Sequence, residues 1–104
     1  GSGVGAGSGS GTGGGSGYSL SGRKATSKPQ PQNNCNEIGT IVVRVTVDRN
    51  GNVISALPGI KGSTNSSSCL KNIAKDAAMR TKWEPKATAA AEQIGSIVYN
   101  FKLN

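Results

Sequence analysis

The feature that most constrains the fold is a stretch in which apolar and polar side chains alternate, residues 40–47 (TIVVRVTV). Every second residue there is apolar and β-branched, whereas the intervening positions include Arg44 and two threonines. Because successive side chains of a strand point to opposite faces of a sheet, this pattern predicts a strand with one buried face. The predicted inward positions are Ile41, Val43, Val45 and Val47.

The next residues predict a hairpin. An Asn-Gly pair, Asn50-Gly51, separates the first strand from a second β-branched run at residues 53–57, and such a pair is the strongest short hairpin signal. The sequence leaves the register of the hairpin open. A two-residue loop would turn Ile54 and Ala56 inward, whereas a three-residue loop with Gly51 in a left-handed conformation would turn Val53 and Leu57 inward.

A helix is predicted after the second strand, because apolar residues recur there at helical spacing. Ser66, Ser67 or Ser68 can cap its start. We expect the helix to run to about Lys82, since Pro85 pushes the residue before it out of the α region. The apolar positions are Leu70, Ile73, Ala74, Ala77 and Ala78.

A third strand is predicted at residues 94–103, with Ile97, Tyr99, Phe101 and Leu103 on one face. A right-handed crossover through the helix places this strand parallel to the second, in the free position beside the first. We therefore expect an α+β fold, in which a three-stranded antiparallel sheet of strand order 2-1-3 has one helix packed on one face. The third strand would then lie at an edge, with one row of backbone donors and acceptors unpaired.

The residues before the first predicted strand read as connecting sequence. Of its 16 glycines, ten lie within residues 1–17, which we interpret as a flexible Gly/Ser-rich linker. Residues 18–38 are polar and read as a semi-ordered approach segment, and residues 39–104 as the folded domain. The sequence predicts neither a transmembrane helix nor a signal peptide, because no run of 18 apolar residues occurs and no positively charged start precedes an apolar stretch.

Composition argues against several classes of function. The chain has no histidine and only five acidic residues, so a catalytic nucleophile or a metal site has few side chains to be built from. We expect no enzyme and no cofactor. The net charge of +7 makes a basic nucleic-acid-binding module an alternative. Four aromatic residues are too few for a base-stacking surface, and we expect no nucleic-acid partner.

The two cysteines, Cys35 and Cys69, allow two readings. A disulfide between them would close a loop of about 35 residues and contribute about 4 kcal/mol in the loop-entropy treatment. A pair of reduced thiols is expected instead if the chain resides in a cytosol.

Several side chains near the helix receive structural interpretations. Lys71, Lys75 and Lys82 read as a solvated helix face, and Asp76 is placed to pair with Arg80 four residues later. Trp83 is the only tryptophan, and we interpret it as a packing residue at the end of the helix.

Three blocks of the sequence resemble the C-terminal domain of TonB family energy transducers. Residues 39–53 (GTIVVRVTVDRNGNV) are similar to the family's hairpin, residues 75–85 (KDAAMRTKWEP) to the end of its helix, and residues 95–103 (GSIVYNFKL) to its last strand. The glycine-rich start and the two cysteines look most like the Bacteroidetes-type members. The family usually has a P-x-Y-P motif before the hairpin, and residues 29–36 (PQPQNNCN) lack its tyrosine and second proline. Val45 stands where the family has phenylalanine.

The resemblance implies a periplasmic domain tied to the inner membrane through an N-terminal anchor that this sequence does not contain. It implies that the domain binds the TonB box of outer-membrane receptors and passes on force generated by ExbB and ExbD, for active uptake. The periplasm favours the disulfide between Cys35 and Cys69. A TolA-like envelope-integrity domain is the alternative within the fold. The box would add as a strand beside the last strand, whose peptide-binding residues are Ser96, Ile97, Val98, Tyr99, Asn100, Phe101 and Lys102.

Overall fold

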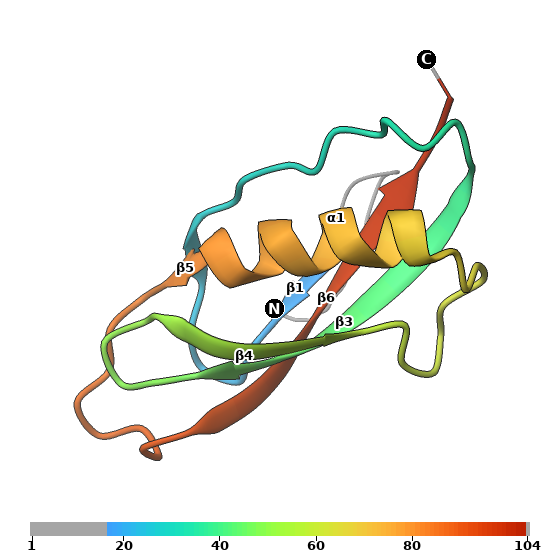
Figure 1. Ribbon diagram of the computed structural model, residues 1–104. Helices are drawn as coiled ribbons and strands as arrows, with labels where there is room; N and C mark the ends of the chain where they lie inside the picture. Colours follow the sequence, from blue (N-terminus) through green and yellow to red (C-terminus); the bar gives the residue numbers. More distant parts are fainter. Residues whose placement is uncertain (1–16, 104) are drawn as a thin grey trace.

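The computed structural model describes residues 17–103, and the interpretation of residues 1–17 as a flexible linker lies outside them except at Gly17, which is the first residue of a strand and not part of a flexible linker. Within residues 17–103 one helix and six strands follow one another. Figure 1 shows their course. Their bounds are β1 (Gly17–Ser19), β2 (Ala25–Ser27), β3 (Gly39–Val47), β4 (Val53–Pro58), α1 (Ser68–Arg80), β5 (Lys82–Trp83) and β6 (Gln93–Phe101).

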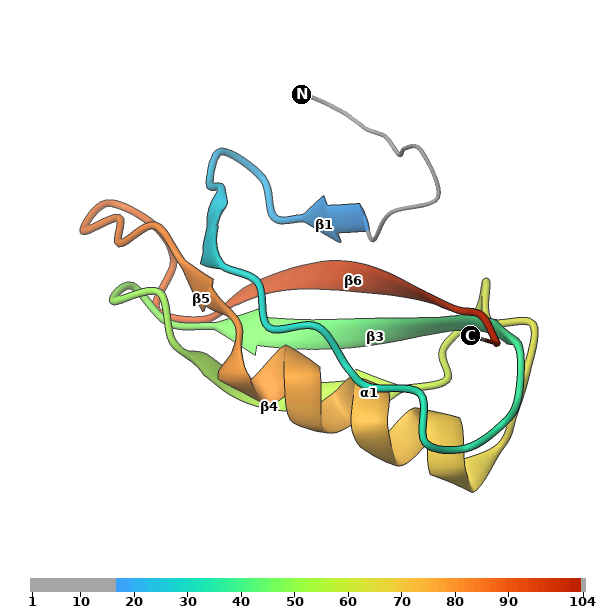
Figure 2. The same ribbon diagram turned by 90° about the horizontal axis from the view of Figure 1, so that it is seen from above.

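The prediction of a three-stranded sheet is wrong. The strands form a four-stranded antiparallel sheet of order β1-β6-β3-β4 and a separate two-stranded antiparallel sheet of β2 and β5. The additional strands come from short segments without an apolar alternation, which a search for periodicity passes over. Helix α1 packs across one face of β3 and β4, and β1 lies beyond β6 (Figure 2).

The hairpin combines the two registers that the sequence left open. Val53 pairs with Val47 and Ser55 pairs with Thr46, so Ile54 is an extra residue between them. This bulge reverses the alternation, and as a result Val53 and Ala56 are both buried while Ile54 and Leu57 are exposed. Each of the two predicted registers is therefore correct at one inward position and wrong at the other.

The loop of the hairpin is held by the side chain of Asp48. One carboxylate oxygen of Asp48 accepts hydrogen bonds from the backbone N–H groups of Asn50 and Asn52, both at 2.9 Å. Gly51 adopts a φ of +91°, and a Cβ at this position would lie 2.0 Å from the carbonyl oxygen of Trp83. A glycine is thus required both by the left-handed backbone and by the close approach of β5.

Helix α1 begins after Ser67, one of the three predicted capping serines, and ends earlier than expected. The hydroxyl of Ser67 accepts a hydrogen bond from the N–H of Leu70. The prediction that the helix continues to about Lys82 is wrong, because Thr81 has an extended backbone and Lys82 and Trp83 pair as β5 with β2. Asp76 and Arg80 form the predicted salt bridge at 3.0 Å, with both side chains exposed.

The core lies between α1 and the helix-facing side of the sheet. The predicted inward residues of β3 are completely buried, and Trp83 packs among them at 2% exposure, as expected for a packing residue. Leu103 was predicted to face inward but is exposed, since β6 ends at Phe101. The helix contributes Leu70, Ala74, Ala77 and Ala78 to this core.

Residues 18–38 are held by polar contacts to three parts of the domain. The buried guanidinium of Arg23 donates hydrogen bonds to the carbonyl oxygens of Glu84 and Asp48, at 2.7 and 2.9 Å. It also donates one to the side-chain oxygen of Gln93, at 3.3 Å. These bonds join the start of the chain to the hairpin loop, to the segment after β5 and to β6. From β2 the chain then runs back along the sheet to β3 (Figure 1).

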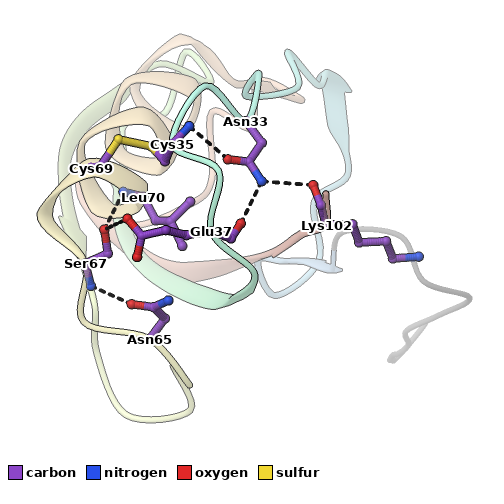
Figure 3. Close-up of a disulfide and its surroundings, with 8 residues drawn as sticks. All are labelled: Asn33, Cys35, Glu37, Asn65, Ser67, Cys69, Leu70 and Lys102. Atoms are coloured by element: carbon purple, nitrogen blue, oxygen red, sulfur yellow. Dashed lines mark hydrogen bonds between the residues drawn. A yellow bond between two sulfur atoms is a disulfide. The ribbon is translucent and has the colours of Figure 1, made fainter. Parts of the chain in front are cut away.

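A disulfide between Cys35 and Cys69 joins this returning segment to the first turn of α1, as predicted (Figure 3). The side-chain amide nitrogen of Asn33 donates to the carbonyl oxygens of Glu37 and Lys102, at 2.7 and 2.9 Å. The hydroxyl of the capping residue Ser67 donates to the carboxylate of Glu37 at 2.7 Å. The returning segment is thereby tied to both the helix and the end of β6.

Replacing both cysteines by alanine should lower the free energy of unfolding by about 4 kcal/mol, since the unfolded chain regains the entropy of a loop of about 35 residues. Denaturant titrations monitored by circular dichroism would measure this loss. Reduced wild-type protein is the matched control and should lose the same amount. Equal stability of the oxidised protein and the double variant would contradict the expectation.

Candidate functional site

The sequence-predicted binding residues lie on β6, which is not an edge strand. Ser96, Ile97 and Val98 pair with Ser19, Tyr18 and Gly17 of β1. The prediction that the outer side of this strand is unpaired is therefore wrong at these three residues. Strand β1 lies on that side of β6, and the ring of its central residue, Tyr18, packs against Trp83 and Tyr99. Tyr99, Asn100 and Phe101 complete β6, and Lys102 follows the strand.

The direction of the backbone groups on β6 follows from the ladder. The carbonyl oxygen of Thr40 accepts from Thr64 and that of Val42 accepts from Gly59, so the even-numbered residues of β3 turn their backbone groups away from β6. The odd-numbered residues of β3 therefore face β6, where their partners are also odd-numbered. It follows that the N–H and C=O groups of Ser96 and Val98 face β1.

An aromatic cluster joins β1 to the core. The Tyr18 ring makes edge contacts with Trp83 and Tyr99, with ring centroids 6.2 and 6.3 Å apart. The amino group of Lys28 lies 5.3 Å from the centroid of the Tyr18 ring. The hydroxyl of Tyr18 accepts a hydrogen bond of 3.2 Å from the side-chain amide of Gln30. Tyr18 is half-buried, so its ring fills a slot whose opening remains at the surface.

Two polar atoms of this cluster are buried without a hydrogen-bond partner in the part of the chain that the structure describes. They are the indole nitrogen of Trp83 and the hydroxyl oxygen of Tyr99, although this hydroxyl lies near enough to the side chains of Thr81 and Tyr18 for both to influence its pKa. Burial raises the pKa of Tyr99 well above the usual tyrosine value. Burial also raises the pKa of Tyr18, an effect that the hydrogen bond from Gln30 partly offsets. Buried donors without a partner are uncommon in folded proteins, so the indole N–H of Trp83 is an exception within this cluster.

Gly95 lets the chain after β1 approach the sheet. A Cβ at Gly95 would lie 2.4 Å from the carbonyl oxygen of Ser19 and 2.9 Å from a methyl carbon of Leu20. The side chain of Leu20 is buried at this position. A glycine on β6 is thus the condition for the close contact of β1 and Leu20 with the strand.

A shallow hollow of about 550 Å³ continues along the end of β6. Its lining is rich in amide side chains and includes one cation, so it is polar. The lining residues are Pro31, Gln32, Asn33, Asn34, Asn100, Phe101 and Lys102.

Residues 17–103 contain neither a candidate metal site nor a candidate membrane-spanning helix. No three His, Cys, Asp or Glu side chains gather closely enough there to hold a metal ion. No helix of this part of the chain has the length and hydropathy needed to cross a membrane. Comparison with known proteins found no matching family model, no matching curated protein and no matching solved structure.

Sequence reasoning missed three residues on which this site depends, Tyr18, Arg23 and Gly95. An isolated aromatic residue in a polar segment is a weak signal, although Tyr18 is one of only four in the chain. Nothing in the sequence pairs Arg23 with backbone carbonyls of distant segments. Gly95 interrupts a strand pattern, and an isolated glycine in a strand indicates a bulge or a close backbone approach.

Replacing Gly95 by alanine should push Ser19 and Leu20 away from β6 and lower the free energy of unfolding by about 1–3 kcal/mol. The matched control is Ser96→Ala, which adds no carbon at the close contact and should change stability by at most about 0.5 kcal/mol. Thermal unfolding of both variants would measure the difference. Equal stability of the two variants would show that β1 and Leu20 do not need the close approach.

The raised pKa of Tyr99 predicts a loss of stability at alkaline pH. The folded protein holds the proton of Tyr99 more tightly than the unfolded chain, whose tyrosine pKa is about 10. The stability contribution is thus complete below pH 10 and decreases above it, by up to about 1.4 kcal/mol per pH unit for this group. Tyr99→Phe should show a shallower decrease, because lysine titration is common to both proteins. Parallel stability curves for the two proteins from pH 9 to 11 would contradict this.

Proposed function

We propose that this domain is the periplasmic peptide-binding domain of a TonB-like energy transducer. The TonB box of an outer-membrane receptor binds as an added strand on the outer side of β6, and the domain passes force to the receptor for active uptake. One observation supports the proposal above the rest, namely that the outer side of β6 pairs with an extended segment, β1, in antiparallel register. This row of backbone groups is therefore a strand-binding surface by its own geometry.

The opposite edge of the sheet is less suited to strand addition. In β4 the groups of Ser55 and Leu57 face β3, by the same alternation that applies to β3. The outward position at Pro58 has no N–H to donate, and the bulge at Ile54 interrupts the register. Proline and bulges at edge strands discourage pairing with another chain. Binding by strand addition therefore favours β6 over β4.

Residues from Ser96 to Lys102 contribute in two ways. The backbone groups of Ser96 and Val98 bind an extended peptide with little dependence on its sequence. The side chain of Ile97 belongs to the core, and beside it lies the aromatic slot that selects one peptide side chain. Lys102 and Asn100 line the polar hollow through which a longer peptide continues.

The proposed geometry is suited to carrying force. A strand pulled along its own axis loads its hydrogen bonds together, so a short interface resists more than its area suggests. ExbB and ExbD, the partners implied by the resemblance, are the proposed source of that force. The disulfide between Cys35 and Cys69 keeps residues 28–38 attached to the helix under such a load.

The test is a titration of isotope-labelled protein with synthetic peptides that carry TonB boxes. The amide signals of Ser96 and Val98 should shift, and that of Ala56 on β4 should not, because only the outer side of β6 exchanges its partner strand. Proline scanning of the bound peptide should weaken binding at every second position, by about five- to tenfold for one lost hydrogen bond.

Alanine at the same peptide positions is the matched control and should cost less where backbone bonds dominate. Unchanged Ser96 and Val98 signals at saturating peptide would overturn strand addition at β6. A proline effect without alternation would indicate a peptide bound in another conformation.

A further inference from the structure

We propose that β1 occupies the position on β6 that the partner's strand takes when it binds. The partner displaces β1 and places a tyrosine side chain between Trp83 and Tyr99, where the Tyr18 ring lies in this structure. This inference rests on the proposed function, because it concerns the same outer side of β6. It adds two things to that function: a competition between the chain and its partner, and a preference for one type of residue at one position of the partner.

Few contacts hold β1 on β6, so β1 can detach without loss of the structure that follows it. The strand has three residues, of which Gly17 and Ser19 face β6 with their backbone groups. Ser19 is exposed, and the chain is held from Leu20 onward by burial of that residue and of Arg23. Release of β1 therefore gives up its pairs with Val98 and Ser96 and the contacts of one aromatic ring. The bonds of Arg23 to Glu84, Asp48 and Gln93 remain.

Addition of a partner outside β1 is a poor alternative. Tyr18 is the one residue of β1 whose backbone groups point away from β6, because its two neighbours use theirs for the pairs with Val98 and Ser96. A single residue offers too short an edge for a further strand. A peptide can therefore pair with the backbone groups of both Ser96 and Val98 only if it occupies the position of β1.

The slot left by Tyr18 selects an aromatic residue with a polar tip. Its walls are Trp83 and Tyr99, which are 2% and 1% exposed, and edge-on packing against two rings favours a third ring. Lys28 lies over the ring position, where a cation favours an aromatic face. The side-chain amide of Gln30 supplies a donor for a hydroxyl at the tip. Tyrosine satisfies all three conditions.

The unpartnered indole N–H of Trp83 gives a reason for exchange. With Tyr18 in place, this donor is buried without an acceptor in residues 17–103. An incoming segment is free of the connection to Leu20 that fixes the depth of Tyr18. It can therefore bring an acceptor within reach of the indole N–H, which the tethered strand does not satisfy. At the position of Gly17 a Cβ meets only ordinary contacts with Val98, at 3.7 Å and beyond, so neighbouring partner residues are not restricted to glycine.

The first experiment releases β1 in the full chain. Ser19→Pro removes the N–H that faces Ser96, whereas Ser19→Ala retains it and is the matched control. Amide hydrogen exchange should become at least tenfold faster at Ser96 and Val98 in Ser19→Pro only. Exchange at Ile97 and Tyr99, whose N–H groups face β3, should stay unchanged and serves as the internal reference. If Ser19→Pro does not fold, Tyr18→Ala is the second releasing variant.

The second experiment supplies the strand as a separate peptide. The probe has the sequence of residues 15–19, Gly-Ser-Gly-Tyr-Ser, with blocked ends, and the control peptide has alanine in place of tyrosine. The tyrosine peptide should bind the released variant at least tenfold more tightly than it binds wild type or Ser19→Ala, with shifts at Ser96 and Val98. The alanine peptide should bind the released variant at least tenfold more weakly than the tyrosine peptide.

The outcomes separate the two proposals. Equal binding of both peptides, with shifts at Ser96 and Val98, overturns the tyrosine preference and leaves strand addition standing. Equal binding of the tyrosine peptide to wild type and to the released variant overturns the competition by β1. No shift at Ser96 and Val98 with either peptide or with TonB-box peptides, in a folded released variant, overturns the inference and the proposed function together.

Discussion

Strand β6 carries two rows of backbone donors and acceptors, and each row needs a partner. The row toward β3 is satisfied over nine residue pairs, from Gln93 to Phe101. The opposite row at Ser96 and Val98 would leave polar groups unpaired beside a buried aromatic cluster, and β1 pairs with it. The course of the chain from Gly17 to the hairpin follows from this requirement, since Tyr18, Leu20 and Arg23 enter the domain as a consequence of where β1 lies.

Residues 18–38 show how a polar segment can be ordered without an apolar core of its own. Arg23 places a cation among carbonyl oxygens of two distant segments and the amide of Gln93. Hydrogen bonds to a charged group are stronger than those between neutral groups, so a few such bonds substitute for apolar burial. Farther along, a disulfide and the side chain of Asn33 hold the segment against α1 and the end of β6. Each of these ties is specific to one pair of groups, and none produces a repeating pattern in the sequence.

This difference explains which parts of the molecule the sequence predicts. β3, α1 and β6 each bury one side, so their apolar residues recur with the period of the element, as in the runs that contain Ile41, Leu70 and Tyr99. In β4 the bulge at Ile54 breaks this alternation. The pairing of Cys35 with Cys69 was also predictable, since only two cysteines occur. β1, β2 and β5 have two or three residues each, too few to show a period.

The candidate site was predicted in part for the same reason. From the sequence we proposed β6 as the peptide-binding strand, but the side chains that shape the slot beside it come from Tyr18 and Trp83, which are 65 positions apart in the chain. The bulge at Ile54 depends on how Gly51 meets β5, a contact between segments that local patterns do not contain.

The position of Gly17 has a mechanical consequence. The chain enters β1 at Gly17, which pairs with Val98, and leaves it toward Leu20. Tension on the chain before Gly17 reaches the pairs of Gly17 and Ser19 first, because the buried residues Leu20 and Arg23 hold the chain behind them. The nine pairs between β3 and β6 lie on the other side of β6 and do not depend on β1. If the two pairs of β1 yield, the outer row at Ser96 and Val98 is exposed while the sheet behind it stays closed.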